Sequence, residues 1–246
     1  MIRDNLAEYA LKRSEGKKLT DIRVGLGYTC ALLDNNDCGL AYTFRNELGN
    51  CCSVLGEAGN LMSRPCAELI PWLMEKNPVK AAVGLSVTNA VLNNQLRCQC
   101  GNVTDFIELD ADDTFGMVGN FVPIRRAAEK KTKKIYVFEM GKERPDETYS
   151  DEDIPVYLPE CSVVVVTATS IMNGTIDRIL FACQKARQVC IVGPSTPLAP
   201  EVFGGKNVTA LAGSIVTDPA MMLRIISEGG GTMQMKPALR HVIYCI

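Results

Sequence analysis

A run of four consecutive valines, in the stretch SVVVVTATS at residues 162–170, most constrains the fold of this chain. A strand that is apolar on both faces must be buried on both faces, as in a parallel sheet covered by helices. Other short apolar runs, KIYVFEM and QVCIVGPS, alternate with the helical patterns VPIRRAAEKK and GTIDRILFACQKA. This alternation predicts a doubly wound, Rossmann-like α/β domain over residues 101–246.

Residues 1–100 have a different pattern. The first helical run is followed by two β-patterned runs around Asn35-Asn36-Asp37, a loop composition that favours a hairpin. Two apolar helical segments come next, and Pro71 either kinks the first or starts a second short helix. These runs are RDNLAEYALKRS, DIRVGLGYTCALLD, GLAYTFRN, RPCAELIPWLMEK and NPVKAAVGLSVTNAVLNNQ. Strands followed by helices predict a small α+β domain over residues 1–100.

Composition and charge exclude several classes of partner. The chain has 246 residues, 22% of them charged, and a net charge of −2, which argues against nucleic acid or a membrane surface as partner. No apolar leader or membrane-spanning run is apparent, so we expect a cytoplasmic protein without membrane insertion. A small molecule is then the expected partner, and homo-oligomerisation stays open.

The eleven cysteines indicate buried thiols rather than disulfides, because the expected compartment is reducing. Cys98 and Cys100, with Cys51 or Cys52, could in principle hold a metal. No further cysteine pair has zinc-like spacing, and His241 is the only histidine, so a closed structural zinc site is not favoured.

The loop after the first strand of the parallel sheet resembles the start of a nucleotide-binding unit. Gly116 and Gly119 allow close backbone approach, but Asn120 and Phe121 stand where a dinucleotide fingerprint continues toward a third glycine. Glu139 follows 23 residues after Gly116, where such domains keep a ribose-binding acid. The loop therefore suits a flat polar heterocycle or its acidic substituent better than a pyrophosphate, unless it is only a tight turn.

The next two strand ends carry a surplus of hydroxyl and amide groups. Capping of the following helix explains Thr175 but not its neighbours, and prolines stiffen the second loop. A rigid polar rim favours ligand recognition at the carboxyl ends of these strands. The candidate residues are Thr169, Ser170, Asn173, Gly174 and Thr175 after one strand, and Pro194, Ser195, Thr196 and Pro197 after the next.

Sequence motifs of common catalytic machinery are absent. The chain has no G-x-S-x-G, H-E-x-x-H or G-x-x-x-x-G-K-[ST] motif. His241 is five residues from the end of the sequence, where a packed or exposed imidazole is favoured over a general base. Whether the protein is an enzyme therefore stays open.

Several phrases resemble a family of unknown function labelled "putative heavy-metal chelation". They are VGNFVP, TSIMNGTIDRIL, GPSTPLAPEVF and ALAGSIVTD, while GLAYTFRNE and GLSVTNAVLN resemble the domain that precedes it in that family. The resemblance implies an enolase amino-terminal-like domain, then a Rossmann-like domain, with a candidate site in the cleft between them. Thr88 and Asn89 would join that site from the first domain.

Three functions follow from these patterns. The leading hypothesis is binding or handling of a small organic ligand, with or without a chelated metal, because the candidate segments offer amides and hydroxyls rather than strong ligands for a transition metal. A heavy metal would then arrive inside an organic chelate. The second hypothesis is an enzyme that uses a nucleotide or an S-adenosylmethionine-like cofactor at residues 116–121. The third is a direct metal site at the cysteines named above.

Overall fold

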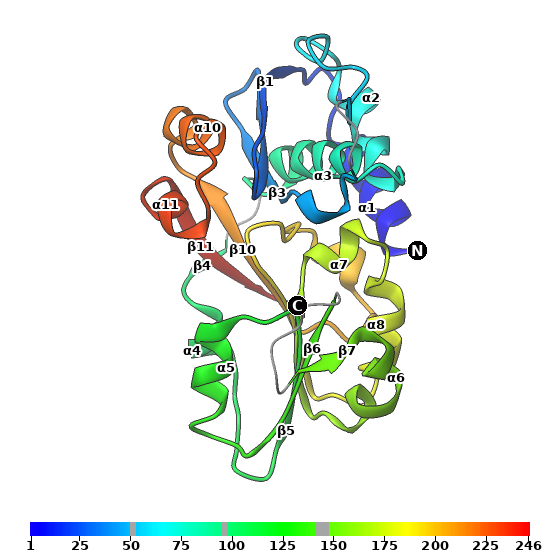
Figure 1. Cartoon of the computed structure of the whole chain (residues 1–246), viewed down its shortest axis with the longest axis vertical. Coiled ribbons are helices and arrows are strands. Elements are labelled where there is room, and N and C mark those ends of the chain that lie inside the picture. The colour runs from blue at the N-terminus through cyan, green and yellow to red at the C-terminus, as the bar shows by residue number, and fades with distance from the viewer. Residues whose placement is uncertain (50–52, 95–97, 141–147) are drawn as a thin grey trace.

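The structure, a computed structural model, describes residues 1–49, 53–94, 98–140 and 148–246 (Figure 1). It contains a three-stranded antiparallel sheet, in the order β1-β2-β3, and an eight-stranded sheet, in the order β4-β11-β10-β9-β8-β5-β6-β7. An α/β architecture with one small antiparallel sheet and one mostly parallel sheet was predicted and is confirmed. The labels Rossmann-like and enolase amino-terminal-like, and the boundary at residue 100, stay predictions.

The small sheet contains the predicted hairpin. Strands β1 (Leu19–Val24), β2 (Tyr28–Leu33) and β3 (Cys38–Tyr42) pair in sequence order. Asn36 takes a left-handed conformation, with φ of 66°, which the short polar side chain of asparagine tolerates in a turn. Helix α3 (Pro78–Leu92) covers one face of this sheet, and the Asn77 side chain caps it by accepting from the Val79 and Lys80 N–H groups.

Two further segments complete the amino-terminal part. Helix α1 (Ile2–Leu11) packs beside α3, and α2 (Cys66–Leu69) continues into a 3-10 helix at Ile70–Met74. Pro71 lies in the first turn of that 3-10 helix, so it starts a short second helix, one of the two outcomes expected from the sequence.

Six neighbouring strands of the large sheet are parallel, from β10 through β9, β8, β5 and β6 to β7. The sequence reversal between β8 and β5 is the switch in strand order at which open parallel sheets bind ligands. The strands are β4 (Gln99–Cys100), β5 (Thr114–Val118), β6 (Lys134–Glu139), β7 (Tyr149–Ser150), β8 (Val163–Thr167), β9 (Gln188–Val192), β10 (Ala210–Val216) and β11 (Leu239–Cys245).

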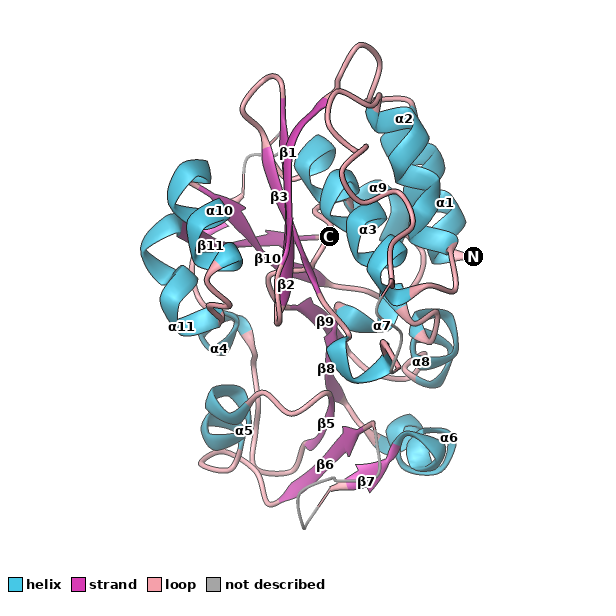
Figure 2. Cartoon of the chain, turned by 45° about the horizontal axis from the view of Figure 1, so that its top comes forward, coloured by secondary structure: helices cyan, strands magenta, loops and turns pink. Residues whose placement is uncertain are grey.

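Helices cover both faces of this sheet (Figure 2). On β8, Val163 and Val165 pack in the core under α5, whereas Val164 and Val166 pack in the core shared with α6 and α8. This alternation explains the uninterrupted valine run. The remaining helices are α4 (Val103–Phe106), α5 (Val122–Ala128), α6 (Ile154–Tyr157), α7 (Thr169–Met172), α8 (Ile176–Ala182), α9 (Pro200–Phe203), α10 (Pro219–Ser227) and α11 (Thr232–Met235).

The amino-terminal and carboxy-terminal parts share one hydrophobic core. Side chains of α1 and α3 belong to the same buried cluster as those of β8, α8 and β9. The Ile2 N–H also donates to the Asp177 carboxylate, at 3.1 Å from Oδ1. Among the described residues, no helix combines the length and apolar character needed to cross a bilayer.

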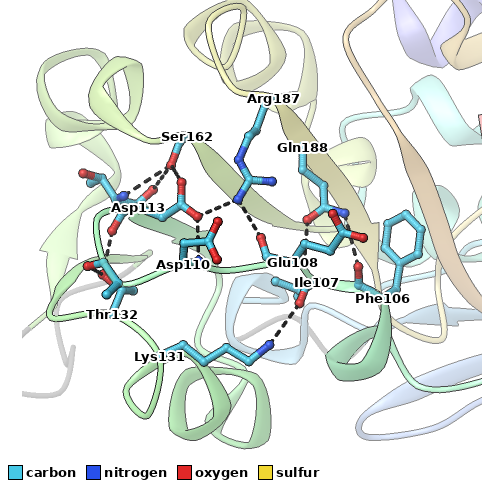
Figure 3. Close-up of polar contacts among 12 residues, drawn as sticks. Phe106, Ile107, Glu108, Asp110, Asp113, Lys131, Thr132, Ser162, Arg187 and Gln188 are labelled. Carbon is cyan, nitrogen blue, oxygen red and sulfur yellow. Dashed lines mark hydrogen bonds and ion pairs between the residues drawn. The ribbon is translucent and has the colours of Figure 1, made fainter.

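A polar network joins the segment before β5 to the starts of β8 and β9 (Figure 3). The Asp113 carboxylate accepts from the Ser162 hydroxyl at 2.6 Å and from the Asp110 N–H at 2.8 Å, and it pairs with Arg187. Burial alone would raise the pKa of Asp113, but these hydrogen bonds and the guanidinium charge outweigh it and lower the pKa to about 2.

We expect the variant Asp113→Asn to lose about 2 kcal/mol of unfolding free energy near pH 7, because a lowered carboxylate pKa stabilises the folded state above the unfolded pKa. The difference from the unmodified protein should shrink as the pH falls below about 4 and vanish only below about pH 2, where the carboxyl group is protonated in both the folded and the unfolded state. Urea denaturation at a series of pH values measures it. The exposed neighbour Asp112 supplies the control Asp112→Asn. A difference that is independent of pH would contradict this account.

Candidate functional site

A pocket of about 590 Å³ lies where the carboxyl ends of β5, β6, β8 and β9 face the open end of the β2–β3 hairpin. A cavity of this size accommodates a small organic molecule. Its wall consists of Tyr28, Tyr42, Phe44, Arg45, Asn46, Glu47, Val118, Gly119, Asn120, Phe121, Phe138, Glu139, Met140, Asp151, Thr167, Ala168, Thr169, Ser170, Asn173, Thr175, Val192, Gly193, Pro194 and Ser195.

The loop after β5 forms one side of the pocket. Gly119 has φ of +88° and donates its N–H to the Phe138 carbonyl oxygen at 2.8 Å, so the chain turns sharply at the sheet edge. The next N–H, that of Asn120, donates to Glu139 Oε2 at 2.8 Å. Asn120 Oδ1 is buried and has no hydrogen-bond partner within the part of the chain that the structure describes.

Burial raises the pKa of Glu139, against the opposing effect of hydrogen bonds from the backbone N–H groups of Asn120 and Met140. The carboxyl group is therefore easier to protonate than an exposed glutamate. Asn120 and Glu139 thus both line this side of the pocket, joined by the hydrogen bond from the Asn120 N–H to Glu139 Oε2.

The strand end of β8 supplies a set of hydroxyl and amide groups. Thr167 Oγ1 and Thr169 Oγ1 are 2.9 Å apart, and the Ser170 hydroxyl donates to the Thr167 carbonyl oxygen at 2.7 Å. Asn173 Oδ1 accepts from the N–H and the hydroxyl of Thr175, at 3.1 and 2.8 Å. The prediction that the Thr175 side chain caps α8 is therefore wrong. Thr175 is the N-cap residue, but its hydroxyl donates to Asn173 Oδ1 and makes no hydrogen bond to the first turn of the helix.

The hairpin contributes an aromatic wall. The Tyr28 and Tyr42 rings meet edge to face, with centroids 5.8 Å apart, and Tyr42 and Phe44 do the same at 5.2 Å. Burial and the neighbouring Tyr42 raise the pKa of Tyr28 to about 12, so it stays a neutral donor. Arg45 follows at the exposed rim. Within the described residues, no hydrogen bond or ion pair of its guanidinium is found.

Sequence reasoning did not select these hairpin residues. The hairpin pattern could have indicated that the two tyrosines are neighbours, because Tyr28 is the first residue of β2, Tyr42 is the last residue of β3, and the two are paired across the sheet. Side chains at directly opposed positions share one face. What the sequence lacked was the information that this end of the hairpin faces the parallel strand ends.

Ten of the sixteen candidate residues line the pocket: Gly119, Asn120, Phe121, Glu139, Thr169, Ser170, Asn173, Thr175, Pro194 and Ser195. Their role in binding a ligand stays a prediction. The six that do not line it are Thr88, Asn89, Gly116, Gly174, Thr196 and Pro197.

Local contacts account for most of these six. The Thr88 hydroxyl donates to the Gly84 carbonyl oxygen inside α3, and the Thr196 hydroxyl donates to that of Ala212. Gly116 lies in β5 under Leu158 and Cys161, and Gly174 lies beside Arg3.

Asn89 acts through the loop that follows β9. Its amide nitrogen donates to the Leu40 carbonyl oxygen at 2.7 Å and to that of Ser195 at 3.0 Å. Ser195 in turn accepts the Tyr42 N–H through its hydroxyl oxygen at 2.8 Å. Asn89 is thus buried behind the pocket wall and positions Ser195.

A neighbouring residue, Asn93, has a similar role. Its amide nitrogen donates to the Thr196 carbonyl oxygen at 3.0 Å, and its oxygen accepts the Leu198 N–H at 2.9 Å. The buried Asn93 side chain therefore replaces the backbone partners that the residue 196–198 segment lacks.

The pocket wall does not fit a heavy-metal ion held by protein ligands alone. It offers amides, hydroxyls, three carboxylates and the Met140 thioether, but no histidine or cysteine, whereas soft metals prefer thiolate ligands. Throughout the described part of the chain, no group of three or more His, Cys, Asp or Glu side chains is arranged to hold a metal ion. No such group includes Cys98. The structure does not describe the side chain of Cys100, and Cys51 and Cys52 lie outside the described residues, so the predicted cysteine site stays a prediction.

Comparison with known proteins agrees with this architecture. An uncharacterized protein of Methanocaldococcus jannaschii is 27% identical over 97% of this chain and 95% of its own length. The crystal structure of a DUF364-family protein of unknown function from Pyrococcus horikoshii superposes with a TM-score of 0.88 at 27% identity over 100% of both chains. A DUF364-family structure from Desulfitobacterium hafniense has a TM-score of 0.83 at 22% identity, over 99% of this chain and 98% of its own, which supports the fold alone.

The family matches divide the chain into two stretches. Residues 7–92 match the family DUF4213, and residues 102–245 match the family DUF364; both carry the description "putative heavy-metal chelation". The resemblance noted in the sequence is thereby confirmed. This chain belongs to the DUF364 family.

Proposed function

We propose that the protein binds a small, flat, polar organic molecule in the pocket at the strand ends. The observation that carries this proposal is the Asn120 side-chain oxygen, buried in the pocket wall with no partner in the described part of the chain. An unsatisfied buried acceptor costs about 1–3 kcal/mol, which a ligand N–H or O–H would recover.

The surroundings of Asn120 narrow the chemistry of that ligand. Glu139 lies beside it, joined through the Asn120 N–H, and supplies a second acceptor. Two adjacent acceptors match a ligand edge with two donors, as on an amino-substituted heterocycle. Phe121 and Tyr42 add aromatic faces for a planar ring, and Arg45 at the rim could pair with an acidic substituent.

The chelation named in the family description is compatible with this proposal if the metal enters as part of the ligand. The pocket residues then grip the organic portion of a chelate, for which amides and hydroxyls are suitable donors and acceptors. The metal keeps its own soft ligands within the chelate and needs none from the protein.

The test compares two pocket variants with the unmodified protein. Thermal shift and calorimetry with amino-substituted heterocycles, their metal chelates and free metal ions should show stabilisation by several degrees for an organic ligand. Asn120→Ala and Glu139→Gln should each weaken binding by about tenfold to a hundredfold. Asn60→Ala, at an exposed position outside the pocket, should bind normally. If only free metal ions bind, and bind all four proteins equally, the proposal is wrong.

A second candidate is an enzyme that uses a nucleotide or an S-adenosylmethionine-like cofactor. The observation in its favour is the position of Glu139, at the carboxyl end of β6 and beside the glycine-containing loop after β5. An acid at this place binds ribose hydroxyls in dinucleotide-binding domains. Adenosine and adenine in the same panel distinguish the two, because a ribose-binding Glu139 predicts that adenosine binds more tightly than adenine and that Glu139→Gln removes this difference.

A further inference from the structure

We infer that Cys30 and Cys38 form a site for a divalent, thiophilic metal ion, separate from the pocket. The two residues lie on the adjacent strands β2 and β3, and their sulfur atoms are 3.2 Å apart. Both side chains are buried, at 0% and 2% exposure. Sequence reasoning treated the cysteines as buried thiols and did not pair these two, because eight residues and a turn separate them.

The surroundings of the pair are apolar. Leu40, Val216 and Ile226 share a buried cluster with the two cysteines, and so do Met222 and Met235 of α10 and α11. The hydrogen bond with Cys38 and burial both raise the pKa of the Cys30 thiol, so Cys30 is protonated in the absence of metal.

Charge balance selects the valence of the ion. Each thiol releases one proton to solvent as its sulfur bonds to the metal, so a divalent ion and two thiolates form a neutral unit. A monovalent ion would leave one uncompensated negative charge in this apolar cluster, which is costly.

The number of available ligands further limits which metal ions this pair of cysteines can bind. Within the described residues no third His, Cys, Asp or Glu completes a metal-binding group here. An ion that requires four strong ligands, as zinc does, is therefore disfavoured. An ion satisfied by two sulfur ligands, such as Hg²⁺, fits the donor set.

The strand register favours a metal over a disulfide. Cys30 is directly opposite Leu40 and Cys38 is opposite Leu32, so the two cysteines are diagonal neighbours. Diagonal positions have Cα atoms about 7–8 Å apart, at or beyond the usual limit for a disulfide. Two metal–sulfur bonds of about 2.3 Å each, the length of a zinc–thiolate bond, would span about 4.6 Å in a linear arrangement. The two sulfur atoms, now 3.2 Å apart, would have to move apart to admit the ion.

The experiment uses the full chain, reduced and loaded with Hg²⁺ in the presence of excess glutathione, which removes metal from single thiols. After gel filtration, elemental analysis gives the metal retained. The unmodified protein should retain one ion per chain more than the Cys30→Ala/Cys38→Ala variant. The control Cys66→Ala/Cys190→Ala removes two other buried thiols and should behave as the unmodified protein.

A single variant guards against misfolding of the double variant. Cys38→Ala alone should lose the same ion, since one thiol cannot hold it against glutathione, whereas Cys66→Ala should keep it. Equal retention by all these proteins would overturn the inference. So would a Cys30–Cys38 disulfide, found by peptide mass analysis after mild oxidation, in a protein that retains no metal.

Discussion

Replacing Gly39 by alanine is expected to lower the free energy of unfolding by about 3 kcal/mol or more. A methyl group at this position of β3 would lie 2.2 Å from both the Ala90 nitrogen and the Ser86 carbonyl oxygen of α3. These are backbone atoms of a long buried helix, so no side-chain rotation can relieve the overlap. Helix α3 would have to move away from the sheet.

Urea denaturation followed by circular dichroism measures this loss. The matched control is Gly27→Ala, because a methyl group at Gly27 meets no atom within 4 Å. The control should change the unfolding free energy by less than about 1 kcal/mol. Equal effects of the two substitutions would show that α3 does not pack on β3 as described.

Replacing Asn93 by alanine is expected to cost about 3 kcal/mol of unfolding free energy. The Asn93 side chain satisfies the buried Thr196 carbonyl oxygen and the buried Leu198 N–H, and alanine would leave both without a partner. Because the same segment includes Ser195 of the pocket wall, binding of a pocket ligand should weaken as well.

The adjacent Asn94 provides the control. It is exposed, and its amide nitrogen donates to Asp37 at 2.8 Å. Since water replaces the lost partner at an exposed position, Asn94→Ala should cost less than about 1 kcal/mol. Chemical denaturation of the two variants compares them directly. An Asn93→Ala protein as stable as Asn94→Ala would remove Asn93 from its role in holding the loop.

Much of the fold was predictable because the hydrophobic patterns are strong. The valine run of β8 predicted a strand buried on both faces, and the Asn35-Asn36-Asp37 loop predicted the hairpin. Strand β11 was missed. Its sequence, LRHVIYC, has a buried centre and exposed ends, and it lies antiparallel beside β10 near the edge of the sheet. The two-residue strands β4 and β7 were missed too, since they are too short to show a period.

The candidate site was predictable only in part. Open parallel sheets bind ligands at the carboxyl ends of their strands, and this tendency predicted Asn120, Glu139 and Ser195 as site residues. All three line the pocket. Asn89 was selected for the same pocket but is buried behind its wall. A sequence indicates that an amide belongs to a helix, but not which neighbouring segment lies across from it.

The amino-acid sequence by itself determined where the strongly patterned strands, helices and turns form, because hydrophobic period and turn chemistry are local properties. It also determined that the strand ends carry neutral hydrogen-bonding groups rather than metal-binding ones. Only the tertiary structure decided which of those groups line a common cavity and which form hydrogen bonds with the backbone instead. It also decided that two cysteines eight residues apart in the sequence have their sulfur atoms 3.2 Å apart. Contacts between segments depend on how the sheets and α3 pack, and packing is a property of the whole chain.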